Sequence, residues 1–485
     1  MKRISIKWFY LIKFTLSFFL LFAQEWTSQT GGINHKQGAD VEIDQRGNIF
    51  MAGGFTGPVT FGDTTLKGTG YSDIFVTKYD TGGKLLWARQ AGAIGHVSQA
   101  WGITADGWGN CVVTGFFGGK AAFGDSIRTS AGLSDIFVAK YDSKGQLSWL
   151  RKAGGRDESY RDQGRNIAFD AGKNVIVVGT FSGPAVFDDT TLTEENNGNV
   201  FLVKYDPEGY MEWARQMGGG TKGLEEDVSV AVDTDDNIIV VGDFGDKGIF
   251  GEKTLTSNGG FDFFIAKYDN RGNIIWVKNF GGKGHDWGVD VVTDSDDNII
   301  VIGCFQGTVA FEKHKLVSHK NSFDVFIAKF NSSGRLFWVE QIGGKNTDWA
   351  TAITLDGFDN PIITGYFKDR TAFDNAVFAS KGGKDIFIAK YDQIGKLLWV
   401  QQVGGTGDDE GWSITAVDSG QTIITGYFQK SASFGEETLD SKGGSELFIA
   451  QVNDPVNWEP PLLALEEPEE TQPSVIPAAN NQPVE

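Results

Sequence analysis

Nine residues that could contact a ligand lie shortly after a Gly-Gly pair or its Gly-Ala equivalent. They are Trp101, Trp287, Trp349, Trp412, His96, His285, Asp286, Asp348 and Asp409. A sugar ring stacks on an indole face, and carboxylates accept hydrogen bonds from sugar hydroxyls. These residues therefore predict a binding site for a glycan or for a surface protein.

A second interpretation of the same residues is structural. The tryptophans could fill gaps at the ends of strands without meeting a ligand. His35, His96 and His285 each follow a repeated tryptophan by nine residues, in different copies of a repeat. Side chains in different copies lie too far apart to ligate one metal, so we expect these histidines to be solvated loop residues.

Two acidic runs resemble the start of a calcium-binding loop. They are Asp233-Thr-Asp-Asp-Asn and Asp294-Ser-Asp-Asp-Asn, in which Asp233/Asp235 and Asp294/Asp296 would be the ligands. The EF-hand pattern requires Gly at position 6 and Glu at position 12. Position 6 is isoleucine in both runs, so we interpret them as hairpin turns and expect no cofactor, with weak calcium binding there as the alternative.

The sequence carries no nucleophile elbow, zinc signature or phosphate-binding loop. Acidic neighbours such as Asp408 and Asp409 could serve a glycosidase. That chemistry depends on the separation of two carboxylates, which a sequence does not reveal. We therefore expect a protein that is not an enzyme, with a polysaccharide hydrolase or lyase as the alternative.

The elements that must position these residues come from a repeat of 61 to 64 residues. Its signature, Trp-x-x-Gln-x-Gly-Gly or a close relative, begins at Trp26, Trp87, Trp149, Trp213, Trp276, Trp338 and Trp399. A period of this size indicates one supersecondary unit that is copied and stacked. Almost all the length variation falls after Gly-Gly, as is typical of surface loops between packed strands.

Each repeat contains four strand signals separated by Asp- and Gly-containing turns. Residues 237–242 form a β-branched run typical of a strand covered on both faces, and residues 135–141 alternate. Four antiparallel strands in each of seven repeats predict an all-β, seven-bladed β-propeller. The last repeat lacks a tryptophan strand, so the N-terminal strand around residues 24–30 should complete it and close the ring. The loops after Gly-Gly should then gather on one face around the channel mouth.

The repeated pattern Gly-Asn-Ile-x-Val-x-Gly-x-Phe, followed by Asp-Ile-Phe-Val-Ala-Lys-Tyr-Asp and Leu-x-Trp, resembles the SBBP β-propeller repeat. The resemblance covers residues 24–454. It implies a propeller that is secreted or displayed on a bacterial surface. It implies little about activity, because members of that family mostly lack an assigned one.

The two ends of the chain differ from the repeat. Residues 1–23 combine basic residues with a short apolar core and predict a cleaved signal peptide. Residues 455–485 are rich in Pro and Glu, which predicts a disordered acidic tail. Residues 24–454 would form the propeller between them, and the mature protein should not insert into a membrane.

Composition limits the choice of partners. The net charge of −20 disfavours nucleic acid as a partner, because both molecules would be polyanions.

Cys111 and Cys304 belong to distant repeats, so we expect no disulfide between them and two buried free thiols. The sequence therefore predicts a monomeric, non-catalytic binding module in the extracellular space, on the cell surface or in the periplasm. A structural component of the envelope is a further alternative.

Overall fold

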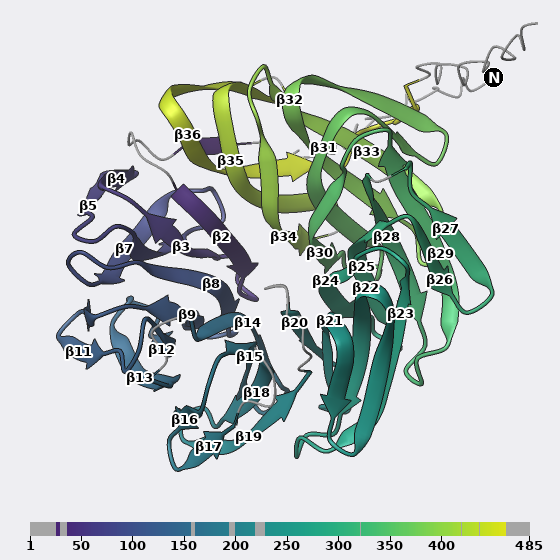
Figure 1. Cartoon of the computed structure of the whole chain (residues 1–485). Coiled ribbons are helices and arrows are strands. Elements are labelled where there is room, and N and C mark those ends of the chain that lie inside the picture. Colours follow the sequence, from purple (N-terminus) through teal and green to yellow (C-terminus); the bar gives the residue numbers. More distant parts are fainter. Residues whose placement is uncertain are drawn as a thin grey trace, which may run out of the picture.

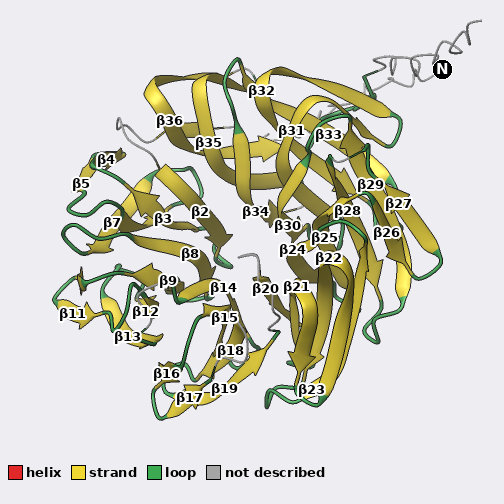
Figure 2. Ribbon diagram, viewed as in Figure 1, coloured by secondary structure: helices red, strands yellow, loops and turns green. Residues whose placement is uncertain are grey.

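A computed structural model describes residues 26–29, 36–156, 161–193, 199–218, 228–320, 322–418, 420–435 and 437–461. The predicted signal peptide lies outside these residues, as does most of the predicted tail. The described residues form strands and no helix (Figure 2). All pairings between named strands are antiparallel, so the all-β prediction is confirmed.

Each sequence repeat is a unit of four strands, which pair in chain order. The first strands are β2 (Lys36–Ile43), β8 (Ser98–Ala105), β14 (Gln163–Phe169), β20 (Val228–Val232), β24 (Asp286–Thr293), β30 (Trp349–Leu355) and β34 (Glu410–Asp418). The second strands are β3 (Ile49–Phe55), β9 (Cys111–Phe117), β15 (Val175–Phe181), β21 (Ile238–Phe250), β25 (Ile299–Gln306), β31 (Pro361–Phe373) and β35 (Gln421–Phe434).

The third and fourth strands complete the units. The third strands are β6 (Asp73–Tyr79), β12 (Asp135–Tyr141), β18 (Asn199–Tyr205), β22 (Lys253–Tyr268), β28 (Phe323–Phe330), β32 (Ala376–Tyr391) and β36 (Glu437–Asn453). The fourth strands are β7 (Leu85–Gly92), β13 (Leu147–Gly154), β19 (Met211–Met217), β23 (Ile274–Gly282), β29 (Leu336–Gly344) and β33 (Leu397–Gly405). In the last unit, β1 (Trp26–Gln29) pairs with β36 through Trp26 and Gln451.

The units are arranged radially around a central space, with the first strands nearest the centre (Figure 1). We number them 1 to 7 in the chain order of these first strands. The second and third strands are buried on both faces, as their β-branched and aromatic runs predict. The apolar core is therefore divided into clusters between adjacent units.

A hairpin between the second and third strands was not expected from the sequence. It is separate in four units, as β4 (Pro58–Phe61) with β5 (Thr64–Lys67), β10 (Lys120–Phe123) with β11 (Ser126–Thr129), β16 (Ala185–Phe187) with β17 (Thr190–Leu192), and β26 (Thr308–Phe311) with β27 (His314–Val317). In units 4, 6 and 7 it continues from the long second and third strands.

The hairpin links neighbouring units. Strand β10 of unit 2 pairs with Ala91 and Gly92 at the end of β7 in unit 1, and β16, β26, β31 and β35 repeat this pairing further along the chain. A phenylalanine at the end of the hairpin's first strand packs the hairpin against its own unit. In unit 2, the ring centroid of Phe123 lies 5.8 Å from that of Phe117 and 5.1 Å from that of Phe137. The recurring phenylalanine pair, six residues apart, therefore marks an extra hairpin.

The repeated tryptophans join units at the opposite end of the strands. The indole N–H of Trp87 donates to the carbonyl of Ser143 in the next unit, at 3.2 Å. A Cβ atom at Gly145 would lie 2.7 Å from the Trp87 ring, and Gly145 has a φ of +75°. Only glycine combines this φ with such close contact, which explains the glycine of the Tyr-Asp-x-x-Gly turn.

The first and last units meet through the same kind of contact. The ring of Trp26, on β1, covers Gly83 of unit 1, where an added Cβ atom would lie 2.6 Å from the ring. The indole N–H of Trp26 donates to Gln451 of unit 7. Residues from both units also share one apolar cluster. Near the end of the described chain, the indole N–H of Trp458 donates to the Val400 carbonyl, so residues 455–461 lie against unit 6.

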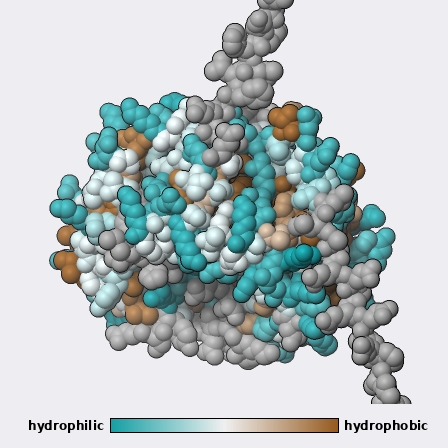
Figure 3. Space-filling view, turned by 90° about the horizontal axis from the view of Figure 1, so that it is seen from above, coloured by the Kyte–Doolittle hydropathy of each residue, from teal (hydrophilic) through white to brown (hydrophobic). Residues whose placement is uncertain are grey.

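Exposed apolar residues are scattered over the surface. In the view from above, hydrophobic side chains form separate spots among hydrophilic ones (Figure 3). Cys111 and Cys304 are buried free cysteines, in agreement with the prediction. No helix in the described part of the chain has the length and apolar character needed to cross a membrane.

Candidate ligand-binding channel

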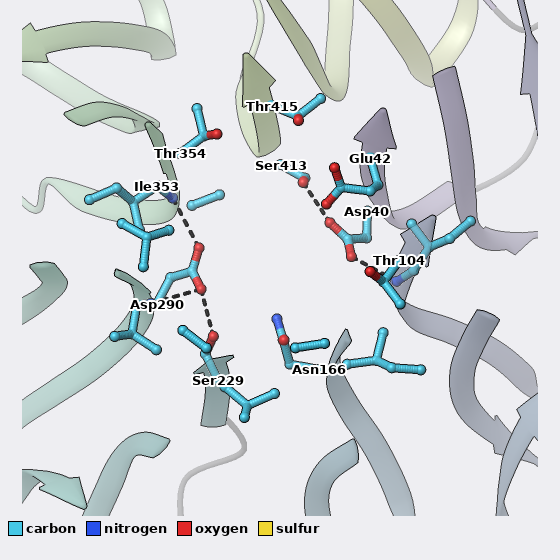
Figure 4. A pocket seen from close by; sticks show the side chains of 18 of the residues that line it. Asp40, Glu42, Thr104, Asn166, Ser229, Asp290, Ile353, Thr354, Ser413 and Thr415 are labelled. Carbon is cyan, nitrogen blue, oxygen red and sulfur yellow. Dashed lines mark hydrogen bonds between the residues drawn. The ribbon is translucent and has the colours of Figure 1, made fainter. Parts of the chain in front are cut away.

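The central cavity is lined by the first strands of all the units and has a volume of about 820 Å³. The wall residues project from short strands that each contain a polar position among apolar ones. A β-bulge lies between Gln37 and Ala39 in β2 and between Gly288 and Asp290 in β24. A bulge re-aims the strand that follows it, and the carboxylates of Asp40 and Asp290 both face the cavity (Figure 4).

Asp40 and Asp290 each connect their own unit to the preceding and the following unit, through equivalent hydrogen bonds. Asp40 accepts from the Ser413 hydroxyl at 2.6 Å and from the Ile103 backbone N–H at 2.8 Å. Asp290 accepts from the Ser229 hydroxyl at 2.6 Å and from the Ile353 N–H at 3.0 Å. The two carboxylates therefore organise opposite sides of the channel wall (Figure 4).

Burial in the channel wall raises the pKa of both carboxyls to about 6, against the lowering effect of these hydrogen bonds. Glu42 lies two residues after Asp40, and burial raises its pKa to about 7, helped by the charge of Asp40. Thr104, Thr354 and Thr415 line the same cavity. The wall is consequently rich in hydroxyl groups and in carboxyls that gain protons near neutral pH.

Three predicted site residues lie at one end of this cavity. Trp101, Trp349 and Trp412 line it together with Arg165. All three indoles are half-buried. The indole N–H of Trp101 is buried without an acceptor among the described residues, whereas that of Trp412 donates to Glu410 at 3.3 Å. We call this end the mouth of the channel.

Trp287 and His285 join the mouth from unit 5. The Trp287 ring centroid lies 5.1 Å from that of Trp349 and 5.7 Å from that of His285. Phe323 contacts both tryptophans. The structure thus brings Trp287, Trp349 and His285 into one aromatic cluster at the mouth, where Trp101 and Trp412 also line the cavity.

The three predicted aspartates lie elsewhere, inside the protein. Asp286, Asp348 and Asp409 have no exposed surface. Asp286 accepts from the Gly282 backbone N–H at 2.6 Å, and Asp409 accepts from that of Gly405 at 2.8 Å. They hold the Gly-Gly segment, and an external ligand would not reach them in this conformation. In the sequence, each of these aspartates follows the second glycine by four residues. This constant spacing was the available signal that they have a structural role.

Each of these aspartates faces a second buried carboxyl. Asp286 neighbours Asp262, Asp348 neighbours Asp324, and Asp409 neighbours Asp385. Burial, reinforced by the neighbouring charge, raises the pKa of Asp286 to about 7 and that of Asp409 to about 6, and raises the pKa of Asp348 well above its ordinary value.

His96 lies apart from the mouth. Its side chain is exposed and packs over Gly118 and Gly119, while its carbonyl accepts from the Tyr71 N–H at 2.8 Å. These contacts belong to the loop between units 1 and 2. The exposure of His96 agrees with the predicted solvated loop residue. The same prediction is wrong for His285, which is half-buried against the rings of Phe261 and Trp287, and His35 lies outside the described residues.

The two acidic runs form turns stabilised by buried lysines. Asp233 lies 2.7 Å from the Lys267 ammonium, and Asp294 lies 2.8 Å from that of Lys329. Both carboxylates also accept from the N–H groups of their own turns. Within the described ranges, no three His, Cys, Asp or Glu side chains converge in a way that could hold a metal ion.

Sequence reasoning missed Asp40, Glu42, Asp290 and Arg165. For Asp40 and Asp290 the signal was a carboxylate at a first-strand position that is filled by Gly102 or Ala352 in other units. Glu42 stands where other units have Thr104 and Thr354, and Arg165 stands where they have Trp101 and Trp412.

Comparison with known proteins gives distant similarities. No family model matches the sequence. The chain is 23% identical over 408 residues to the WD repeat-containing protein L264 of Acanthamoeba polyphaga mimivirus, covering 67% of this chain and 29% of that protein. It is 25% identical over 351 residues to the regulatory protein FlaEY of Caulobacter vibrioides, covering 66% and 35%. The chain therefore spans about a third of the length of these curated relatives.

Two solved structures resemble the fold. A protein of unknown function from Dyadobacter fermentans has a TM-score of 0.43 at 11% identity, covering 88% of this chain and 99% of that one. A polysaccharide lyase described as an ulvan lyase has a TM-score of 0.43 at 9% identity, covering 85% and 91%.

Proposed function

We propose that the chain is a closed seven-bladed β-propeller that is secreted and acts as a non-catalytic binding module for glycans. Support for the closed ring comes from β1, which pairs with β36 while Trp26 covers Gly83 of unit 1. Support for export comes from the basic and apolar residues of the segment 1–23. The mature protein would be a monomer on the cell surface or in the surrounding medium.

The observation that carries the binding role is the mouth of the channel. Trp101, Trp349 and Trp412 lie around a cavity of about 820 Å³, which is within the usual range of ligand sites. Indole faces bind the apolar face of a sugar ring, and the hydroxyl-rich wall below them can exchange hydrogen bonds with sugar hydroxyls.

A glycan array with the secreted chain tests this function. We expect Trp349→Ala and Trp412→Ala to weaken binding about tenfold each, as the loss of one aromatic platform costs about 1–2 kcal/mol. Trp108→Ala is the matched control, because Trp108 is 63% exposed on the turn after β8, at the far end of that strand from Trp101. Equal binding by all variants, or binding to no glycan, would contradict the proposal and direct attention to a protein partner.

A hydrolase or lyase is a second candidate because of Glu42. Its pKa of about 7 suits proton transfer at neutral pH, and Asp40 lies two residues away in the same wall. In this alternative, incubation with a bound glycan would release new reducing or unsaturated ends, and Glu42→Gln would abolish the release without loss of binding. A bound glycan that stays intact would leave the binding module as the function.

A further inference from the structure

A lysine and a glutamate form an ion pair beside the mouth, between units 6 and 7. The Lys384 ammonium on β32 lies 2.6 Å from the Glu410 carboxylate on β34, and the two side chains are 33% and 14% exposed. The pair is therefore open to solvent on one side. It brings a strong hydrogen-bond donor and a strong acceptor to the same place.

The same two positions hold other side chains between other units. Between units 5 and 6 they are Phe323 and Trp349, whose ring centroids lie 5.7 Å apart. Between units 1 and 2 they are Ser72 and Gln99, which both lie against Gly54. Aromatic or neutral polar side chains thus join two units at this place. Packing of the units therefore does not require an ion pair, which costs desolvation energy when half-buried.

Aromatic side chains hold both charged groups. The Lys384 ammonium lies 4.0 Å from the Tyr366 ring centroid. The Glu410 carboxylate accepts from the Trp412 indole N–H at 3.3 Å and is also hydrogen-bonded to Tyr427. Among the described residues, Glu410 is the one acceptor that hydrogen-bonds to the Lys384 ammonium. Because an ammonium has three N–H groups, donors remain for a ligand.

The charges next to the ion pair balance each other. Lys368 stands opposite Lys384 in the pairing of β31 with β32, and its side chain is exposed. The exposed Asp408 accepts from the Lys384 backbone N–H at 3.1 Å. Two ammonium groups therefore meet two carboxylates, those of Asp408 and Glu410. This place offers no net attraction to an acidic ligand.

Two oriented indole rings lie on the two sides of the unit boundary. Trp349 belongs to unit 6 and Trp412 to unit 7, and both line the cavity. The ring centroid of Trp349 lies 5.1 Å from that of Trp287, and that of Trp412 lies 5.1 Å from that of Tyr427. Such ring contacts restrict the rotation of each indole. The ion pair is thus accompanied by two fixed aromatic platforms.

Glucose has the matching chemistry. Its hydroxyl groups are equatorial, so C–H groups form both faces of the ring and can stack on an indole. Adjacent hydroxyls lie at the edge of the ring, where one can accept from an ammonium while its neighbour donates to a carboxylate. In a β-1,4-linked glucan, the hydroxyls of the second and third carbons are the free adjacent pair.

Building on the proposed glycan function, we propose that Lys384 and Glu410 form a subsite for the adjacent equatorial hydroxyls of a neutral β-linked glucan. Lys384 donates to one hydroxyl, and Glu410 accepts from the next. Trp349 and Trp412 stack on sugar rings of the same chain. The subsite thereby selects a neutral sugar by the configuration of two neighbouring carbons.

Three hexasaccharides with the same linkage test the subsite by calorimetry on the whole secreted chain. Cellohexaose carries the equatorial pair. β-Mannohexaose differs only in the axial hydroxyl of the second carbon, and a glucuronan hexamer carries a carboxylate at the sixth carbon of each ring. We expect cellohexaose to bind about tenfold more tightly than mannohexaose, the effect of one lost hydrogen bond to a charged group. The glucuronan hexamer should bind no more tightly than cellohexaose.

Variants of the ion pair assign the preference to these two residues. Lys384→Met removes the ammonium and keeps an unbranched side chain over Tyr366. It should lower the affinity for cellohexaose about tenfold and remove the preference over mannohexaose. Glu410→Gln keeps an acceptor oxygen without the charge, so it should lower the affinity about threefold.

Lys152→Met is the matched control for the loss of a half-exposed ion pair. Lys152 is 32% exposed and pairs with Asp135, and it lies on β13, a fourth strand at the outside of unit 2. This variant should leave the binding of all three hexamers unchanged. Melting temperatures verify that each variant is folded.

The outcomes separate the subsite from the function on which it rests. If cellohexaose and mannohexaose bind equally and Trp349→Ala abolishes both, the glycan function stands and the subsite is overturned. An unchanged preference in folded Lys384→Met, or tighter binding of the glucuronan hexamer, also overturns it. The same holds if the array reveals another glycan and none of the three hexamers binds. If no glycan binds at all, the proposed function itself fails.

Discussion

At the residue scale, the glycine of each Tyr-Asp-x-x-Gly turn is required by the tryptophan of the preceding unit. The contact recurs between Trp149 and Gly209 and between Trp338 and Gly395, where a Cβ atom on either glycine would lie 2.7 Å from the ring. The glycine thereby permits the indole to lie flat on the turn. Tryptophan and glycine form one contact although 60 residues separate the first pair along the chain and 57 the second.

We predict that Gly395→Ala lowers the free energy of unfolding by about 2–4 kcal/mol, since it adds a clash to a strained backbone. Its Cβ would lie 2.7 Å from Trp338, and φ is +88°. Urea unfolding measures the change. Gly357→Ala in the same unit is the control, because no atom of the described residues outside its own turn lies within 4 Å of its Cβ. Equal effects of the two substitutions would contradict this account.

The candidate site was predictable in part at this scale. The tryptophans were identified because they are large aromatics outside the repeated tryptophan series, in a segment that sequence analysis assigned to loops and that the structure places in the first strands. Asp286, Asp348 and Asp409 were assigned to the same site because a sequence does not reveal whether a loop carboxylate faces solvent or its own backbone. Arg165 was missed because its guanidinium is placed in the wall of the cavity by stacking on Trp101, which lies more than 60 residues earlier in the chain.

At the element scale, β1 has only four residues but occupies the place of a full outer strand. It pairs with β36 through Trp26 to Gln29. Its tryptophan covers Gly83 just as Trp213 covers Gly272 in the middle of the chain. The short strand should therefore contribute as much as an internal one.

We predict that Trp26→Ala and Trp213→Ala each lower the free energy of unfolding by about 2–3 kcal/mol, somewhat less than for a fully buried tryptophan. Both indoles are half-buried and donate one hydrogen bond. Chemical denaturation of the two variants side by side gives the comparison. A cost below about 0.5 kcal/mol for Trp26→Ala alone would show that β1 is not an integral strand.

The four strands of each unit could be predicted because their patterns repeat at constant spacing. The added hairpin could not, because its strands have three or four residues where separate, too few for a period to be recognised. Only the fixed interval between two phenylalanines indicated that the segment was rigid.

At the scale of the whole molecule, buried and half-buried carboxyls are distributed among the units that surround the central channel. They occur in the channel, as Asp40, Glu42 and Asp290, and between units, as Asp286, Asp324, Asp348 and Asp409. Each has a folded-state pKa above its ordinary value, mainly because burial disfavours the charged form. The folded protein therefore binds more protons than the unfolded chain between about pH 4 and 7.

We predict that stability rises as the pH falls from 7.5 to 5. A carboxyl with a raised folded pKa contributes stability that is fully present below its unfolded pKa near 4, and this contribution is lost as the pH rises through 6 to 7. Below about pH 4, stability should fall again as the pH decreases, because the carboxylates with a lowered folded pKa then gain protons. These are Asp170, Asp294 and Asp356. Melting temperatures across this range measure the effect.

The double variant Asp286→Asn, Asp409→Asn is the corresponding control. Both amides keep an oxygen for the Gly282 and Gly405 N–H groups but cannot ionise. Its melting temperature should vary less with pH than that of the parent. A parent that is most stable at pH 7.5 would contradict the predicted protonation of these pairs.

The hairpin that units 2, 3, 5, 6 and 7 each pair with the preceding unit has a consequence for engineering. Outer strands β7, β13, β23, β29 and β33 all receive the same kind of partner from the following repeat. A gene shortened or lengthened by one whole repeat, and spliced within the loops of variable length, would leave these outer strands with such a partner. Repeats could then be exchanged as whole units. The angle between adjacent units would have to change for the first and last units still to meet.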